Sequence, residues 1–231
     1  MARTFVLVHG GWCGAWVWRD VLSGLRKLGH HGSAPTLTGL GERQRCGVAT
    51  ADLAIHIEDV VSHIWMEDLS DVMLVGWSYA GAVTTGTLDR LPGRIRSMIY
   101  LDAFMPANGK AVIDYNKHAK IQVESAMERD EPIPPPPLKY FGVSDPKLID
   151  FTEPRLSAQP WRTLQQPIQL TGPQTRIPLT YVACTSYGHT PFTERLAEME
   201  ARPDVRTATI ASDHFCMLSA PDETLGVLIS S

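Results

Sequence analysis

Short apolar runs alternate with segments of helical periodicity along most of the chain. Six short runs, mostly β-branched, are typical of strands, and the apolar positions between them recur at the spacing of an amphipathic helix. The predicted strands are Phe5–Val8, His31–Leu37, Val72–Gly76, Ile95–Leu101, Ile177–Cys184 and Val205–Ile210, and the predicted helices are Ala15–Leu28, Ala51–Glu67, Ser78–Leu91, Pro191–Glu200 and Pro221–Ile229. This alternation predicts an α/β fold with a doubly wound, mainly parallel sheet of six strands.

One long segment, at about 106–176, departs from this alternation. It contains the run EPIPPPPLKYF and further prolines but no clear strand, so it is too long for an ordinary connection. Its apolar residues favour an ordered cap over a disordered linker, and they are Tyr140, Phe141, Leu148, Ile149, Phe151 and Trp161. We therefore expect one domain over residues 1–231, with a cap inserted above the site.

Composition narrows the classes of function. A chain of 231 residues with 44% hydrophobic content can bury one sizeable core. With a net charge of −4 and no cluster of Lys or Arg, neither nucleic acid nor a membrane surface is an expected partner. The four cysteines have neither zinc-site nor disulfide-framework spacing, and no apolar run suits a signal peptide or membrane span. We expect a cytoplasmic protein without metal or cofactor that acts on small molecules, with a homodimer left open.

The segment VGWSYAGAV, residues 75–83, places Ser78 directly after a predicted strand and between Gly76 and Gly81. The spacing G-x-S-x-G is typical of a nucleophile elbow, in which small residues allow a very tight strand-to-helix turn. The alternative is an ordinary turn in which Ser78 caps the following helix. Two further motifs favour the elbow.

The first of these motifs is VLVHGGWCGAW, residues 6–16, in which a strand runs into a pair of glycines. Acyl transfer needs donors aimed at the developing oxyanion, and glycines leave main-chain N–H groups accessible. The N–H groups of Gly11 and of Tyr79, directly after the serine, would form this oxyanion hole. For the glycine pair alone, a simple tight turn is the alternative.

The second motif is ASDHFCMLSAPDE, residues 211–223, which places His214 after the last predicted strand. A histidine on that loop can lie over the end of the sheet where Ser78 projects, and serine needs such a base to act as a nucleophile. We take Trp12, Phe104 and His9 as candidate substrate contacts. For His9 and for His189, turn or packing roles are the simpler interpretation.

Several segments together resemble the compact α/β-hydrolases that include plant methylesterases, hydroxynitrile lyases and small bacterial esterases. They are FVLVHGGWCGAWVW, LTGLGER, VGWSYAG, YLDAF.P and DHF..LS.P, and they span most of the chain except the cap. The resemblance implies the α/β-hydrolase fold, a lid over the pocket and a preference for esters with small or aromatic groups. It also supports Ser78 and His214 as nucleophile and base, with Gly11 and Tyr79 as oxyanion donors.

The third triad member departs from these relatives, which usually place an acid after the penultimate strand. Here CTSYGHTPF offers no carboxylate before Glu194, and Asp213 adjoins the base in sequence. Asp102 ends the strand expected beside the nucleophile strand, where a buried charge needs a partner. We predict that Asp102 completes the triad, with Glu194 in reserve and a turn-capping role for Asp102 as the alternative.

Together these motifs predict a serine hydrolase that cleaves small carboxylic esters through an acyl-enzyme on Ser78. The lyases resemble this chain but carry a hydroxylated residue at the position of Gly10 and a lysine at that of Phe215, and both are absent here. Lyase-like chemistry, cofactor-free oxygenase chemistry in the same pocket and a non-catalytic receptor for small molecules are the alternatives.

Overall fold

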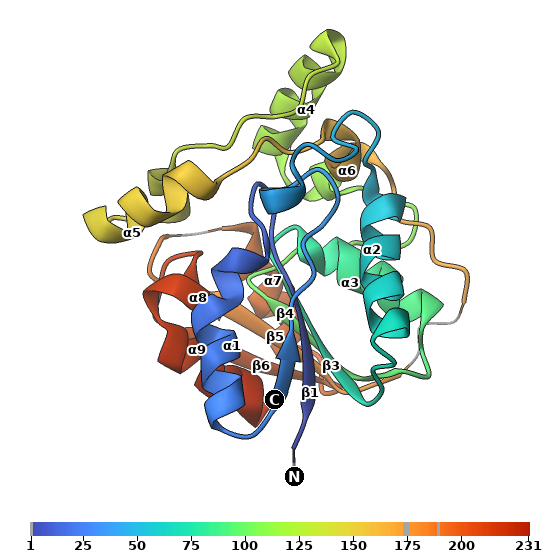
Figure 1. The fold of residues 1–231 in the computed structure, drawn as a ribbon, viewed down its shortest axis with the longest axis vertical. Helices are drawn as coiled ribbons and strands as arrows, with labels where there is room; N and C mark the ends of the chain where they lie inside the picture. Colours follow the sequence, from blue (N-terminus) through green and yellow to red (C-terminus); the bar gives the residue numbers. More distant parts are fainter. Residues whose placement is uncertain (1, 173–175, 189) are drawn as a thin grey trace.

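The structure, a computed structural model, describes residues 2–172, 176–188 and 190–231. Six parallel strands form one sheet in the order β2-β1-β3-β4-β5-β6 (Figure 1). The strands are β1 Thr4–Val8, β2 His31–Ser33, β3 Val72–Trp77, β4 Ile95–Leu101, β5 Leu179–Cys184 and β6 Val205–Ile210. This sheet confirms the predicted fold class, an α/β fold with a doubly wound parallel sheet.

Helices cover both faces of the sheet because side chains alternate along each strand. Val6 and Val8 of β1 belong to the core beneath α2, α3 and α7, whereas Phe5 and Leu7 belong to the core beneath α1, α8 and α9. In Figure 1, α1, α8 and α9 lie on one side of the strands, and α2 and α3 on the other. These helices are α1 Arg19–Lys27, α2 Leu53–Met66, α3 Ala80–Arg90, α7 Pro191–Glu200, α8 Cys216–Ser219 and α9 Pro221–Ser230.

Most predicted elements differ from those observed by one or two residues at an end, and two differ more strongly. β2 ends at Ser33 because only its three residues pair with β1, and Pro35, shortly afterwards, has no N–H to extend the ladder. The predicted helix Ala15–Leu28 is divided into a 3-10 turn, Ala15–Trp18, followed by α1. Both differences lie at element ends, where local pattern is least informative.

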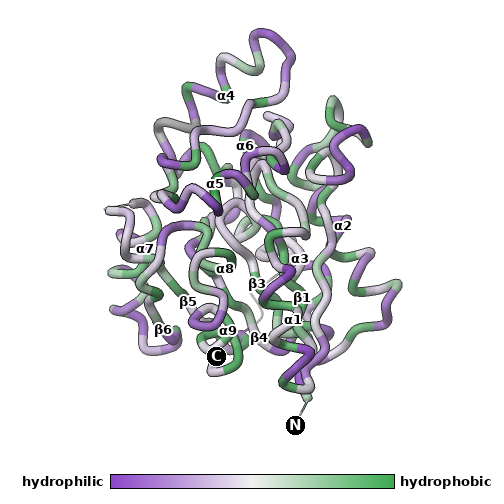
Figure 2. Tube along the Cα trace, turned by 60° about the vertical axis from the view of Figure 1, so that its left-hand side comes forward, coloured by the Kyte–Doolittle hydropathy of each residue, from purple (hydrophilic) through white to green (hydrophobic). Residues whose placement is uncertain are grey.

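The inserted segment carries three helices, α4 Lys117–Arg129, α5 Pro146–Thr152 and α6 Trp161–Gln165, joined by long connections. They lie beyond the end of the sheet at which β3 leads into α3 (Figure 1). An isolated bridge between Ile133 and Gln159 ties two of these connections together. Along this segment hydrophilic and hydrophobic residues alternate (Figure 2), as in a layer with one buried face. Residues 173–175, at its far end, lie outside the described residues.

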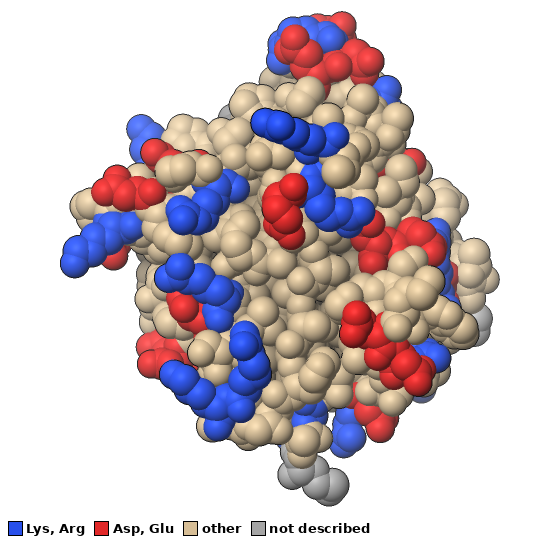
Figure 3. All heavy atoms as spheres, in the orientation of Figure 1, with Lys and Arg blue, Asp and Glu red and all other residues tan. Residues whose placement is uncertain are grey.

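The face shown in Figure 3 carries charged side chains of both signs, with Lys and Arg gathered mainly at its lower left and Asp and Glu mainly at its right. Among the described residues, no helix combines the length and the apolar character that crossing a membrane requires.

Candidate active site

Ser78 lies at the apex of a tight turn between β3 and α3. Its backbone occupies the left-handed region, with φ 56°, which is uncommon for a residue with a Cβ and marks local strain. The flanking glycines are required by space, since a Cβ at Gly76 would lie 2.4 Å from Thr84 Oγ1 and one at Gly81 2.0 Å from the carbonyl oxygen of Phe104. The turn therefore has the geometry of a nucleophile elbow, and Ser78 lines a cavity of about 210 Å³.

Asp102 follows the neighbouring strand β4. Trp77 of β3 pairs with Leu101 of β4, so Ser78 and Asp102 both come directly after the last pair of this ladder. Asp102 also has a left-handed backbone, with φ 46°, and its side chain is completely buried. Its Oδ1 accepts a hydrogen bond of 3.0 Å from the backbone N–H of Cys184. The ends of β4 and β5 thus hold the carboxylate at the same edge of the sheet as the serine.

His214 comes from the loop between β6 and α8. Its Nδ1 lies 2.6 Å from Asp102 Oδ2, and its backbone N–H donates to the carbonyl of Phe141 in the cap at 3.1 Å. The rings of Phe141 and Phe192 each lie with their centroids 5.3 Å from that of the imidazole. Because a carboxylate only accepts hydrogen bonds, the Nδ1 proton points to Asp102 and Nε2 of the neutral imidazole keeps its lone pair. His214 and Ser78 line the same cavity.

The loop after β1 packs closely against the elbow through its two glycines. A Cβ at Gly10 would lie 3.0 Å from the Cβ of Ser78, and one at Gly11 would lie 3.9 Å from the Cβ of Tyr79. Within the described part of the chain, the backbone N–H groups of Gly11 and Tyr79 have no protein acceptor. The two predicted oxyanion donors are therefore neighbours beside Ser78, and the fold does not use their N–H groups.

His9 lies outside this cavity, which corrects the prediction that it contacts substrate. It is completely buried, its Nδ1 lies 2.8 Å from the carbonyl oxygen of Gly10, and its Nε2 accepts the N–H of Leu37 at 3.0 Å. Burial lowers the pKa of His9 to about 4, so the ring stays neutral at pH 7. His9 therefore supports the glycine loop from the buried side, through its contact with the carbonyl of Gly10. His189, the other histidine considered, lies outside the described residues.

Trp12 and Phe104, the other predicted substrate contacts, line the cavity. Most other walls come from the cap and from the start of α7, and several are aromatic. They are Val112, Asn116, Gln122, Pro136, Tyr140, Phe141, Leu164, Tyr187, Thr190, Pro191 and Phe192. The site is thus a narrow, largely apolar space whose reactive groups lie at its sheet end.

Tyr187 is a site residue that sequence reasoning missed. Its hydroxyl donates a short hydrogen bond to Asp102 Oδ2 and lies 3.2 Å from His214 Nδ1. The sequence shows that this loop has no carboxylate. No local pattern indicates that Tyr187 is the residue of the loop that contacts Asp102 and His214.

Gln159 of the cap is a second missed residue, and it holds the glycine loop. Its buried Oε1 accepts the backbone N–H of Trp12 at 2.9 Å, and its Nε2 donates to Thr163 Oγ1 at 2.6 Å. Trp12 in turn donates through its Nε1 to the carbonyl of Ile133 at 3.1 Å. The cap and the candidate oxyanion loop are therefore joined by direct hydrogen bonds.

Below the elbow, His56 of α2 fixes the side chain of Tyr79. The His56 Nε2 must donate to the carbonyl of Thr38, 2.7 Å away, because a carbonyl only accepts. Its Nδ1 then accepts the Tyr79 hydroxyl at 2.9 Å. Burial lowers the pKa of His56 to about 4 and raises the pKa of Tyr79 well above its usual value, so both groups are neutral.

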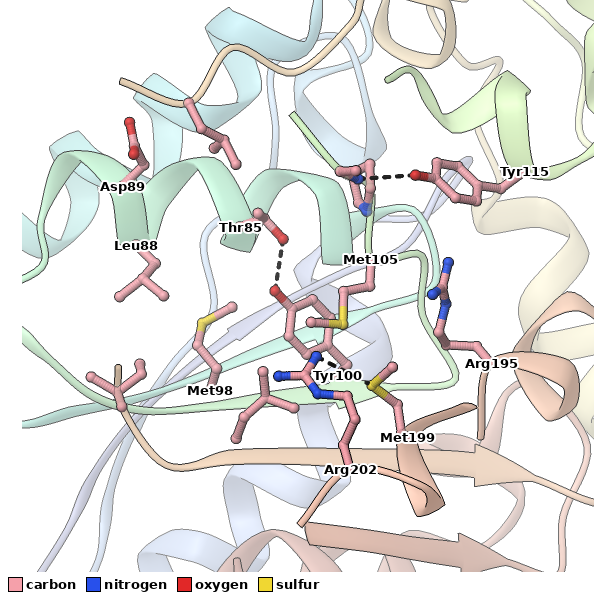
Figure 4. Close-up of a pocket in the computed structure, with 15 residues that line it drawn as sticks. Thr85, Leu88, Asp89, Met98, Tyr100, Met105, Tyr115, Arg195, Met199 and Arg202 are labelled. Carbon is pink, nitrogen blue, oxygen red and sulfur yellow. Dashed lines mark hydrogen bonds between the residues drawn. The ribbon is translucent and has the colours of Figure 1, made fainter. Parts of the chain in front are cut away.

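Glu194, the reserve candidate for the acid, lies in the first turn of α7 and lines a smaller cavity of about 110 Å³, which shares the walls Phe104, Pro191 and Phe192 with the Ser78 cavity. A larger cavity of about 260 Å³, drawn in Figure 4, shares no lining residue with the Ser78 cavity. Thr85 and Tyr100 are hydrogen-bonded in that larger cavity at 2.7 Å. Neither cavity contains Ser78 or His214. Among the described residues, no group of His, Cys, Asp and Glu could hold a metal ion.

Comparison with known proteins places this site in a family. The family model described as "Alpha/beta hydrolase family" matches residues 5–227. A protein of Nocardioides sp. (strain SG-4G) named carbendazim hydrolyzing esterase is 33% identical, and the alignment covers 95% of each chain. Methylesterase 10 of Arabidopsis thaliana is 35% identical over 105 residues, which are 44% of this chain and 38% of that protein.

Solved structures share the whole fold. An extracellular α/β-hydrolase from a Paenibacillus species superimposes with a TM-score of 0.85 at 22% identity, covering 99% of this chain and 98% of the other. Polyneuridine aldehyde esterase superimposes with a TM-score of 0.79 at 19% identity, covering 100% and 99%. With the family model extending from β1 into α9, these matches establish that the chain belongs to the alpha/beta hydrolase family.

Proposed function

We propose that this protein is a carboxylesterase-type serine hydrolase that cleaves small esters, short-chain or aromatic, through an acyl-enzyme on Ser78. Ester hydrolysis is supported by its family and by full-length similarity to a protein named as an esterase. The assignment of the site rests on one observation above all. His214 Nδ1 and Asp102 Oδ2 form a buried contact of 2.6 Å, and the imidazole shares a cavity with a strained elbow serine.

In the proposed reaction, Ser78 Oγ attacks the ester carbonyl while His214 Nε2 takes its proton. The N–H groups of Gly11 and Tyr79 stabilise the oxyanion of the tetrahedral intermediate. His214 then returns the proton to the leaving alcohol, which departs and leaves the acyl group on the serine. Water enters and gives a proton to His214 as it attacks the acyl carbonyl. His214 then returns that proton to Ser78 Oγ as the bond to the acyl group breaks, which releases the acid and the free serine.

The walls of the cavity support substrates with small or aromatic groups. Trp12, Phe104 and Phe141 provide flat apolar surfaces, and a cavity of about 210 Å³ accommodates a compact molecule. The reacting groups lie at one end, so the acyl or alcohol portion of the ester extends toward the cap.

Hydroxynitrile lyase chemistry is disfavoured by space as well as by residue type. A Cβ at Gly10 would lie 2.9 Å from a ring carbon of Trp77, so a hydroxylated side chain there has no room. Phe215 is buried, with its ring centroid 4.9 Å from that of Trp77, and does not line the cavity. Gly10 and Phe215, at the two positions that the lyases use, are thus both packed against Trp77.

We further propose a cytoplasmic location, for which the four free cysteines are the supporting observation, since free thiols are typical of reducing compartments. Small-molecule esters are the proposed partners. A homodimer remains a prediction from the sequence.

The proposed function is tested with a panel of short-chain and aromatic esters, lactones and amides. Replacing Ser78 by Ala should lower ester turnover on the order of 10⁶-fold while leaving the fold intact, because the loss is chemical. A fluorophosphonate should label the wild type at Ser78 only, and an aryl ester should give a burst of released alcohol. Ser62→Ala, on the exposed side of α2, is the matched control. Retention of most ester hydrolysis in the Ser78 variant would refute the mechanism.

A further inference from the structure

We propose that Tyr187 is a positioning residue whose phenol holds the Asp102 carboxylate in the orientation that serves His214. The inference rests on the proposed function, because it concerns the same base. Tyr187 lies in the loop between β5 and α7, a segment that contributes no acid to the site.

The Asp102 carboxylate receives donors from three directions. The Cys184 N–H reaches Oδ1 at 3.0 Å, while His214 Nδ1 reaches Oδ2 at 2.6 Å and the Tyr187 hydroxyl makes a short bond to the same Oδ2. Since a carboxylate only accepts, the phenol must be the donor, and its oxygen then faces the Nδ1–H of His214 at 3.2 Å. Tyr187 thereby contacts both the acid and the base.

A buried carboxylate needs this support for two reasons. The torsion that rotates a carboxylate about its Cβ–Cγ bond is soft, so hydrogen bonds rather than the rotamer set the direction of its oxygens. Asp102 is also completely buried, and an incompletely satisfied charge there is costly. Without the phenol, Oδ2 would keep His214 as its single donor among the described residues. Among the described residues, the direction of the carboxylate would then rest on the Cys184 N–H at Oδ1 and on His214, the group that Asp102 is meant to orient.

The surroundings of Tyr187 keep its phenol in place and protonated. Gly142 of the cap, with φ +81°, lies directly against it, and a Cβ at Gly142 would lie 2.2 Å from the Tyr187 Cβ. Burial, followed by the nearby charge of Asp102, raises the pKa of the Tyr187 phenol far above its usual value. The phenol is therefore a neutral donor throughout the working pH range.

The loop after β5 thus supplies a hydrogen-bond donor, and the acid reaches the base from β4. In the relatives that the sequence resembles, that loop usually carries the acid itself. Here Asp102 and Tyr187 both lie on the Nδ1 side of the imidazole. The carboxylate follows β4, and the hydroxyl that holds it comes from the loop after β5.

Tyr187→Phe tests this role by removing one oxygen and leaving the ring. We expect kcat to fall about 10- to 100-fold with little change in KM, because a hydrogen bond to a charged group is lost. The phenol also draws charge from Oδ2. Its loss leaves Oδ2 to His214 alone among the described residues, so the acid limb of the kcat/KM profile should move to higher pH by about half a unit or more.

The matched control is Tyr115→Phe, which removes a hydroxyl that accepts the backbone N–H of Ala107 beside the larger cavity. It should leave both kcat and the acid limb unchanged. An unchanged kcat in Tyr187→Phe, or a reduced kcat with an unmoved acid limb, would overturn the positioning role.

A double-mutant cycle with Asp102→Asn separates coupling from general damage. If the phenol acts through the carboxylate, the double variant should lie within about twofold of Asp102→Asn alone, because coupled residues are not additive. Fully additive losses would contradict the inference.

The Ser78→Ala measurement distinguishes the two proposals. If that variant keeps esterase activity, the proposed function fails, whereas an inactive Ser78 variant beside a fully active Tyr187→Phe refutes only the role of Tyr187.

Discussion

The Asp102 carboxylate is buried in the interior of the molecule, and hydrogen bonds offset the cost of removing it from water. Donors from Cys184, Tyr187 and His214 reach its two oxygens. The left-handed backbone at Asp102 lets the chain turn toward Ala103 and Phe104 directly after β4 while the side chain faces back over the sheet edge. A residue in this setting is kept for the contacts that it makes, since a neutral apolar residue would be cheaper to bury.

Replacing Asp102 by Asn should leave the fold intact and lower kcat by up to ~10⁴-fold, because the amide can present its NH₂ to the imidazole and favour the wrong tautomer. Steady-state kinetics with thermal unfolding of both proteins gives the comparison. Glu194→Gln is the matched control, since Glu194 lines a different cavity. Near-normal turnover in Asp102→Asn together with a collapse in Glu194→Gln would transfer the role of acid to Glu194.

The sequence was informative about those residues whose chemistry comes with a local pattern. Ser78 stands inside a glycine-flanked pentapeptide, and His214 follows the last strand. Tyr187 and Gln159 had no such pattern, because their roles depend on contacts with residues far away in sequence. His9, predicted as a substrate contact with packing as the simpler interpretation, has the packing role, because its ring is buried in the core.

At the scale of elements, two glutamines, the buried Gln159 and the half-buried Gln166, fasten the cap to the sheet domain. Gln159 binds the N–H of Trp12 in the candidate oxyanion loop, whereas Gln166 binds the N–H of Ala54 at the start of α2 at 2.8 Å. Trp12 has a left-handed backbone, with φ 61°, so its peptide depends on this external support. The position of the cap and the shape of the candidate oxyanion loop are therefore linked by this hydrogen bond.

Gln159→Ala and Gln166→Ala should therefore have different effects on catalysis. Each removes a cap-to-core hydrogen bond and should lower the free energy of unfolding by about 1–3 kcal/mol. Only Gln159→Ala should also lower kcat, on the order of tenfold, because misplaced oxyanion donors stabilise the transition state less well. Urea unfolding and ester kinetics on both variants make the comparison. Equal catalytic losses in the two would show that the cap acts on the site without the Trp12 contact.

The doubly wound parallel sheet followed from the alternation of apolar segments, and five of the six strands were predicted to within about two residues. The order of the strands was implied only by the resemblance to the α/β-hydrolases. The cap helices α4, α5 and α6 were not individually predictable. Their apolar residues pack against sequence-distant parts of the chain, as Val123 and Leu164 do in the core beneath α2 and α3, so periodicity within the segment is weak.

For the whole molecule, two buried neutral histidines connect stability to pH. Burial lowers the pKa values of His9 and His56 to about 4, whereas an unfolded chain has the ordinary value of 6.5. Between these values the unfolded state binds more protons than the folded one, so stability is fully present above pH 6.5 and is lost as pH falls toward 4. The loss is up to about 3 kcal/mol for each histidine.

Urea unfolding followed by tryptophan fluorescence at several pH values between 7 and 4 measures this dependence. Replacing His9 or His56 by Gln should flatten the slope of stability against pH, whatever the variant does to stability at pH 7. His31→Gln, at an exposed position, is the control and should keep the slope of the wild type. A slope that neither core variant alters would show that other groups govern acid unfolding.

The spacing of the three candidate catalytic residues along the chain has a consequence for folding. Ser78 and Asp102 belong to one short β3–α3–β4 unit, whereas the contact between Asp102 and His214 spans 112 residues. Pairings between distant segments close larger loops and form later than local ones. A newly synthesised chain would therefore bring Ser78 and Asp102, the candidate nucleophile and acid, together well before His214, the candidate base, arrives. It would remain inert toward esters until the C-terminal segment docks, so that the final step of folding is also the step that starts catalysis.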